Sequence, residues 1–181
     1  MAETIDSLTR ITEPGTYRLD GDLGGDGVAS LSEAAIRIEA DDVVLDGGGH
    51  ALAGNGVSDS TAVAVAASRP LTGVTVRDLR VVDWEIGLYV RGVTDVTVRG
   101  VEATDNGYGM LVENSRRCRL RGSTVRGNLI GVCLAPPGGG FSVGDSSIER
   151  NRLRDLDRRA DCLSPSSPDA RASERSNPDR G

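Results

Sequence analysis

Apolar residues alternate with polar ones in short runs along most of the chain, and glycine, asparagine or aspartate separates the runs. One stretch holds three such runs in succession: Leu88 with Val90, Val96 with Val98, and Val101 with Ala103. An apolar period of two is typical of β-strands that bury one face. The pattern therefore predicts three short strands in immediate succession.

The same pattern repeats along the chain. Residues 88–109 and 110–131 align over 22 residues without a gap. Three sets of equivalent residues recur at this period: Val76, Val98, Leu120 and Val143; Val81, Ala103, Val125 and Ile148; Gly87, Gly109 and Gly131. The spacing is 22 residues throughout, except for the last step of the first two sets, where it is 23. Three strands in one repeat cannot enclose a core, so we predict that each repeat is one coil of a solenoid.

The predicted fold class is all-β: a right-handed, single-stranded parallel β-helix of about five coils, with the hand set by the usual crossover preference. Residues 1–33 are expected to form an N-terminal strand and cap region, and 34–156 the β-helix repeats, with a looser stretch at 47–62. Residues 157–181 lose the period and are rich in Ser, Pro, Arg and Asp, which predicts a disordered tail. The expected inward columns are Leu88/Met110/Val132, Val96/Cys118/Phe141 and Val81/Ala103/Val125/Ile148.

Composition narrows the function classes. Glycine occurs 24 times and aromatics make up 3% of the 181 residues, as suits short strands and tight turns. All 21 basic residues are arginine, facing 27 acidic residues, which is the basis for a hypothesis of a halophilic, GC-rich source. The net charge of −6 argues against nucleic acid as a partner. No apolar run approaches the roughly 18 residues of a membrane span, and no secretory signal is visible, which leaves localisation open.

The charge is distributed unevenly. Residues 1–60 hold 12 acids and 3 arginines, whereas residues 61–156 hold 10 acids and 13 arginines. The acidic excess therefore belongs to the first third of the chain, and any basic face lies further on.

Soft metal ligands are scarce. The chain has one histidine, His50, and one methionine besides Met1, Met110. Its three cysteines form no CxxC pair, which predicts neither a disulfide framework nor a zinc site. Cys118 aligns with inward residues, while Cys133 aligns with outward ones and is expected to be exposed; Cys162 is in the tail. We expect no cofactor and no copper or zinc centre.

The segments Ile11–Asp20 and Ile38–Gly54, followed by the 22-residue units, resemble the right-handed β-helix proteins of the NosD copper-oxidase accessory family. This family shares its repeat type with carbohydrate-binding proteins and sugar hydrolases. The resemblance covers about residues 5–155 and implies a pectin lyase-like fold, without one activity. Its members are mostly exported or at the cell surface. The copper function is not carried over, because the chain lacks the His, Met and Cys supply.

Arginine recurs at one strand-end position in three consecutive coils, at Arg77, Arg99 and Arg121. Guanidinium groups stacked about 5 Å apart repel each other unless they are screened or an anion bridges them. Four more arginines add to the charge around the third coil: Arg116, Arg117, Arg119 and Arg126. Such a row suits the carboxylate or sulfate groups of an acidic polysaccharide. The alternative is a solvated edge balanced by Asp78, Asp95 and Glu102.

A candidate catalytic pair comes from the same spacing. Asp83 and Asp105 are 22 residues apart, so they are expected in one column, with Glu85 close by. Two carboxylates there would act as an acid/base pair of a glycoside hydrolase, or hold calcium in a polysaccharide lyase with Arg80 or Arg126 nearby. Trp84 is either a stacking platform for a sugar ring or a cover for the edge of the core.

Other polar positions favour structural roles. Asn106, Asn128 and Asn151 share one column, which predicts a hydrogen-bonded asparagine ladder rather than a polar binding row. Asp41, Asp42 and Asp46 are expected to be turn residues. The glycines at 47–49 lack the Lys-Ser/Thr of a phosphate loop, and His50 is expected in a surface loop.

Three hypotheses of function remain open. The first is a non-catalytic module that binds a polysaccharide or a surface partner along its flank. The second is a polysaccharide lyase or glycoside hydrolase that uses Asp83 and Asp105. The third is a truncated fragment of a longer β-helix protein. The open end of the solenoid is a further candidate surface for self-association.

Overall fold

A computed structural model of the chain describes residues 1–24 and 34–158, which form short strands without any helix. The strands belong to three sheets. Sheet A holds β1 (Glu3–Ile5), β3 (Gly15–Leu19), β6 (Val43–Asp46), β9 (Leu71–Arg77), β12 (Val93–Arg99), β15 (Arg116–Arg121) and β18 (Ser142–Gly144). Sheet B holds β2 (Thr9–Ile11), β5 (Ala34–Ile38), β8 (Thr61–Val65), β11 (Ile86–Arg91), β14 (Tyr108–Glu113), β17 (Ile130–Ala135) and β20 (Arg154–Asp157). Sheet C holds β4 (Leu23–Gly24), β7 (Ala51–Ala53), β10 (Arg80–Val82), β13 (Glu102–Thr104), β16 (Thr124–Arg126) and β19 (Ser147–Glu149).

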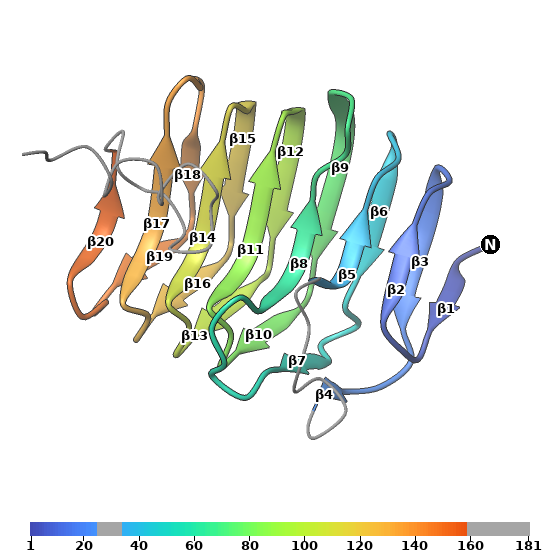
Figure 1. Cartoon of the computed structure of the whole chain (residues 1–181), viewed down its shortest axis with the longest axis horizontal. Helices are drawn as coiled ribbons and strands as arrows, with labels where there is room; N and C mark the ends of the chain where they lie inside the picture. The colour runs from blue at the N-terminus through green and yellow to red at the C-terminus, as the bar shows by residue number, and fades with distance from the viewer. Residues whose placement is uncertain (25–33, 159–181) are drawn as a thin grey trace, which may run out of the picture.

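The chain visits the three sheets in turn, so that each strand pairs in parallel with its equivalents in the neighbouring coils. Figure 1 shows the result, a stack of about six turns from β1 at one end to β20 at the other. This confirms the predicted all-β parallel β-helix. Within the described residues, no helix is long and apolar enough to cross a membrane.

The inward columns follow the predicted register. Leu88 pairs with Met110, and Met110 pairs with Val132. Val81, Ala103, Val125 and Ile148 likewise align on consecutive strands of sheet C. The first three of these are at most 2% exposed, so apolar side chains stack along the axis and exclude water.

The looser stretch at 47–62 contains β7, whose Leu52 is fully buried in the core. One expectation about an outer position is wrong. Cys133 shares its outward column with Leu111 as expected, but both are 0% exposed. An apolar period shows which side chains point outward, but not which of them are then covered. The predicted tail, 157–181, lies outside the described residues except for Asp157, which ends β20, and Arg158.

The corners between sheets use left-handed backbone. One corner repeats at Asp78, Gly100, Gly122 and Asp145, and the next at Asp83, Asp105, Gly127 and Arg150, with φ between 50° and 69°. Glycine and aspartate are the residues that adopt this conformation at low cost. At all of these corners except Arg150, the backbone conformation is therefore enough to account for the residue type.

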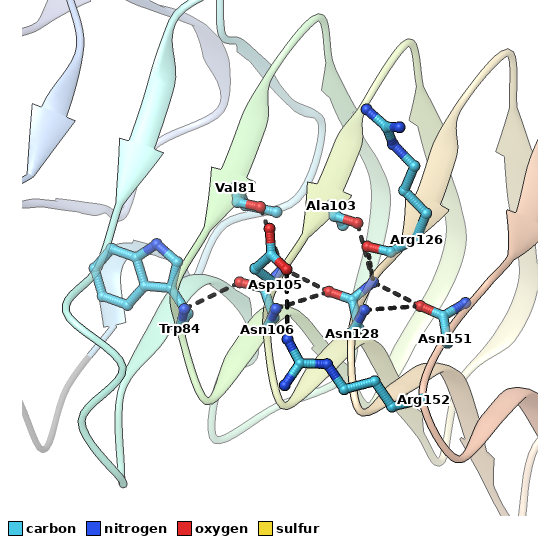
Figure 2. A network of polar contacts seen from close by, with 9 residues as sticks. All are labelled: Val81, Trp84, Ala103, Asp105, Asn106, Arg126, Asn128, Asn151 and Arg152. Carbon is cyan, nitrogen blue, oxygen red and sulfur yellow. Dashed lines mark hydrogen bonds and ion pairs between the residues drawn. The ribbon is translucent and has the colours of Figure 1, made fainter.

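A hydrogen-bonded ladder joins the corners between sheets C and B, as Figure 2 shows. Asn128 is fully buried, and its Oδ1 accepts from the backbone N–H and from Nδ2 of Asn106, both at 2.9 Å. Its Nδ2 donates to the Ala103 carbonyl at 3.0 Å and to Asn151 Oδ1 at 3.0 Å. Each asparagine thus satisfies backbone groups of its own coil and of its neighbours.

Other residues take over at the two ends of the ladder. At the N-terminal end Trp84 occupies the equivalent position, and its backbone N–H donates to Asn106 Oδ1 at 3.0 Å. At the C-terminal end Asp155 Oδ1 accepts from the backbone N–H and from Nδ2 of Asn151, both at 2.9 Å. These hydrogen bonds hold the pKa of the Asp155 carboxyl below its usual value.

We expect Asn128→Ala to lower the free energy of unfolding by about 3 kcal/mol, because truncating the side chain leaves several buried backbone and amide groups without hydrogen-bond partners. Urea denaturation followed by circular dichroism measures the loss. Asn55→Ala is the control, since Asn55 is exposed and outside the ladder. Equal losses in the two variants would contradict the structural role of the ladder.

Candidate functional site: an arginine pair on sheet A

The arginine row predicted from the sequence lies in register on the outer face of sheet A. Arg99 on β12 pairs with Arg77 on β9 and with Arg121 on β15. The strand spacing places their Cα atoms about 4.8 Å apart. The three side chains leave the sheet at one position, at its corner with sheet C.

Arg77 is not available to a ligand in the same way as its two neighbours. Its guanidinium lies 2.8 Å from Asp46 Oδ2, and a second nitrogen lies 3.6 Å from Asp78. Asp46 is only 7% exposed, and Arg77 is its cross-strand neighbour. Asp46 is therefore a partner for an arginine in the next coil as well as a residue before a turn.

Arg99 and Arg121 are exposed, and within the described part of the chain they make no ion pair and no side-chain hydrogen bond. The corner residue that follows explains the difference. Arg77 precedes Asp78, whereas Arg99 precedes Gly100 and Arg121 precedes Gly122. Two adjacent coils thus lack the carboxylate that accompanies the arginine of the coil before them.

The acids expected to balance this edge bind other arginines. Asp95 makes a bidentate contact with Arg117, at 2.8 and 2.6 Å, and lies 3.6 Å from Arg119. The hydrogen bond from Arg117 holds the pKa of the Asp95 carboxyl below its usual value. Glu102 pairs with Arg126 at 3.1 Å. None of these carboxylates therefore neutralises Arg99 or Arg121.

The same fold shows what a stacked arginine pair does with a carboxylate. Arg10 on β2 and Arg37 on β5 are cross-strand neighbours one coil apart. Both bind Glu39: Arg10 through Nε and Nη2 at 3.0 Å, and Arg37 through Nε at 2.5 Å. Glu39 is partly buried, which raises the pKa of its carboxyl, but the two arginines outweigh this and lower it below its usual 4.5. Two stacked guanidinium groups therefore form a carboxylate clamp in this molecule.

Sheet C carries two open hollows, which include residues of the coils that hold Arg99 and Arg121. The first measures about 370 Å³ and the second about 380 Å³. They share Glu102 and Arg126, so they continue one another across the outer face of the sheet. The first is lined by Gly100, Val101, Glu102, Gly122, Thr124, Arg126, Ser147 and Glu149.

Asp83 and Asp105 occupy the same corner of adjacent coils, as the spacing predicts, and both are exposed. Asp105 lies 3.6 Å from the Arg152 guanidinium, as Figure 2 shows. It also lines the second hollow. Their left-handed backbone accounts for aspartate at both positions without any chemistry. Glu85, nearby, accepts a hydrogen bond from the Asp59 backbone N–H.

Trp84 is 2% exposed, and its indole N–H donates to the Leu52 carbonyl at 3.0 Å. A Cβ on Gly54 would lie 2.9 Å from the Trp84 ring, so this glycine leaves the space that the ring occupies. The ring covers the edge of the core and presents no free face on which a sugar would stack. Trp84 is therefore not part of the site proposed below.

The chain was compared with known proteins. It matches the family described as "Periplasmic copper-binding protein (NosD)" over residues 26–160, about three quarters of its length. This chain belongs to the NosD family. No curated protein and no solved structure matched it.

The family description names copper, but the described residues of this NosD-family protein do not fit a copper site. No group of three or more His, Cys, Asp or Glu among them is placed to hold a metal ion. Cys118 is buried, which raises the pKa of its thiol to about 11, and Met110 points into the core at 1% exposure. His50 lies elsewhere, at a corner with its Nδ1 3.5 Å from Asp22. These soft donors do not converge.

Sequence reasoning missed the two features that define the site. One is the pairing of Asp46 with Arg77, which are 31 residues apart rather than 22. The other is the clamp of Arg10 and Arg37 on Glu39, in the coils where the repeat is irregular. The sequence did contain one signal, the residue that follows each arginine of the row. Aspartate follows Arg77, whereas glycine follows Arg99 and Arg121.

Glu39 provides a pH-dependent test of the clamp. A carboxyl with a lowered pKa in the folded state contributes stability above about pH 4.5, its ordinary value, and loses it as the pH falls through the folded pKa. We expect Glu39→Gln to flatten the fall in stability below pH 4.5, measured as the urea midpoint at several pH values. Glu3→Gln, at an exposed end strand, is the control and should leave the profile unchanged.

Proposed function

We propose that this NosD-family β-helix is a non-catalytic module that binds an acidic polysaccharide on its flank, through Arg99 and Arg121. The observation that carries the proposal is the contrast between two stacked arginine pairs. Arg10 and Arg37 hold a carboxylate of their own chain, whereas Arg99 and Arg121 hold none among the described residues. A uronate carboxylate or a sulfate of a glycan would supply the missing anion.

Charge distribution supports the same site. The protein as a whole carries −6, which opposes nonspecific attraction of polyanions. A local pair of unneutralised guanidinium groups therefore selects anions by contact geometry, rather than by long-range attraction. Binding should weaken as salt rises, because exposed charges are screened beyond about 8 Å at physiological ionic strength.

We expect Arg99→Ala with Arg121→Ala to weaken binding to immobilised hyaluronan or polygalacturonate about tenfold at low salt, because two charge-assisted contacts are lost. Surface plasmon resonance measures the affinity. The matched control is Arg10→Ala with Arg37→Ala, which removes the same charge from an equally stacked pair that Glu39 already occupies. Loss of binding in both double variants would mean that total charge, and not this pair, is responsible.

The corner glycine allows a sharper test. Gly122 has φ +51°, and a Cβ there would meet nothing within 4 Å. Aspartate already occupies the equivalent corner at Asp78 and Asp145, with φ of 52° and 50°. We expect Gly122→Asp to place a carboxylate beside Arg121 and to weaken glycan binding about as much as loss of the arginine.

Gly122→Asn is the control for this substitution, since asparagine tolerates the same backbone without adding charge. It should bind within about twofold of the parent, a change expected of an uncharged surface substitution. An equal effect of the two variants would show that the side chain blocks the surface and that charge is not involved.

Catalysis by Asp83 and Asp105 stays a prediction of the sequence. The same preparations test it: release of reducing ends or of unsaturated products from either polymer would indicate a hydrolase or a lyase. Asp83→Asn with Asp105→Asn should leave binding unchanged under the proposal, because neither residue belongs to the arginine pair.

A further inference from the structure

The surface changes sign at the corner formed by Gly100 and Gly122. On the sheet A side stand Arg99 and Arg121, with two positive charges that no described residue neutralises. On the sheet C side lies the first hollow, whose charged lining residues are Glu102, Glu149 and Arg126. Two carboxylates and one guanidinium give this hollow one net negative charge.

The charged residues that line the first hollow lie on three neighbouring strands of sheet C. Arg126 on β16 binds Glu102 on β13 at 3.1 Å and is the cross-strand neighbour of Glu149 on β19. Glu149 makes no ion pair within the described residues. Its exposed carboxylate accepts hydrogen bonds from hydroxyl groups but repels a second anion. Thr124 and Ser147 supply further hydroxyl groups beside it.

The positive patch is also short. Asp78 closes it on one side, where its carboxylate lies 3.6 Å from Arg77 and, through Oδ1, only 2.7 Å from the position of a Cβ on Gly100. On the other side the column continues to Gly144, which brings no charge, and then to Asp145 at the next corner. Within this column, positive charge without a partner is therefore limited to two coils, a span of about 5 Å between strands. A polymer with an anion on every unit finds no continuous track here.

We propose that the ligand is a glycan in which an anionic sugar is bordered by a neutral, hydroxyl-rich sugar, rather than a uniformly charged polymer. The anion binds Arg99 and Arg121, and the neutral unit crosses the Gly100–Gly122 corner into the hollow on sheet C. Glu102 and Glu149 accept its hydroxyl groups there. This inference rests on the proposed function and adds the chemical class and the direction of the glycan.

The experiment compares two oligosaccharides of equal length by isothermal titration calorimetry at low salt. One is a hyaluronan tetrasaccharide, in which glucuronate alternates with uncharged N-acetylglucosamine. The other is a galacturonate tetramer, in which every unit is charged. We expect the parent protein to bind the alternating tetrasaccharide about fivefold more tightly, although it carries half the charge, because only that ligand avoids repulsion in the hollow.

Glu149→Gln tests the cause of this preference. The substitution keeps a hydrogen-bonding side chain but removes the repulsion, so the affinity for the galacturonate tetramer should rise and the preference should fall toward twofold or less. The affinity for the alternating ligand should fall by no more than about twofold, because the amide oxygen of glutamine still accepts a hydroxyl hydrogen, although more weakly than a carboxylate. Because Glu149 is exposed and has no ion pair among the described residues, the variant is expected to fold.

The outcomes separate the two proposals. If the galacturonate tetramer binds as tightly as the alternating ligand or more tightly, affinity follows the total charge of the ligand. This inference is then overturned, while the proposed function stands. A preference that survives Glu149→Gln unchanged likewise overturns it. If neither ligand binds the parent and neither polymer does so, the proposed function fails and this inference fails with it.

Discussion

The parallel stacking of coils governs everything else in this molecule. Each residue lies one strand spacing, about 4.8 Å, from its equivalents in the coils before and after it. Apolar equivalents then form a dry column, and amide equivalents form a ladder, as Asn106 and Asn128 do. Charged equivalents face a harder constraint, because two like charges at this distance repel each other unless solvent and salt screen them or an anion lies between them.

The protein meets this constraint in several ways along its length. Arg77 binds Asp46 across one coil, and Arg117 binds Asp95 across another. Arg10 and Arg37 share Glu39 between them. Arg99 and Arg121 follow none of these solutions within the described residues, and that exception marks the site. The surface at the corner glycine after Arg121 is open, whereas the Asp78 carboxylate lies against the corner glycine after Arg99.

The period of 22 residues was enough to predict most of the fold. It predicted three strands per coil, the parallel stacking and the column of Val81, Ala103 and Val125, because a regular repeat places equivalent residues together whatever lies between them. It could not predict Asp46 beside Arg77, or Arg10 beside Arg37, because those coils differ in length and the offset becomes 31 or 27 residues. The burial of Trp84 depends on Gly54 and Leu52, which lie in that irregular part.

Under the proposed function, Arg99 and Arg121 are a counterpart of the clamp around Glu39 that takes its anion from outside the chain. Nitrogen-15 NMR of the arginine Nε–H groups during titration with sodium glucuronate tests it most directly. We expect the signals of Arg99 and Arg121 to shift together and saturate, while those of Arg10 and Arg37 stay unchanged. Equal small shifts at all exposed arginines, or shifts confined to other residues, would contradict it.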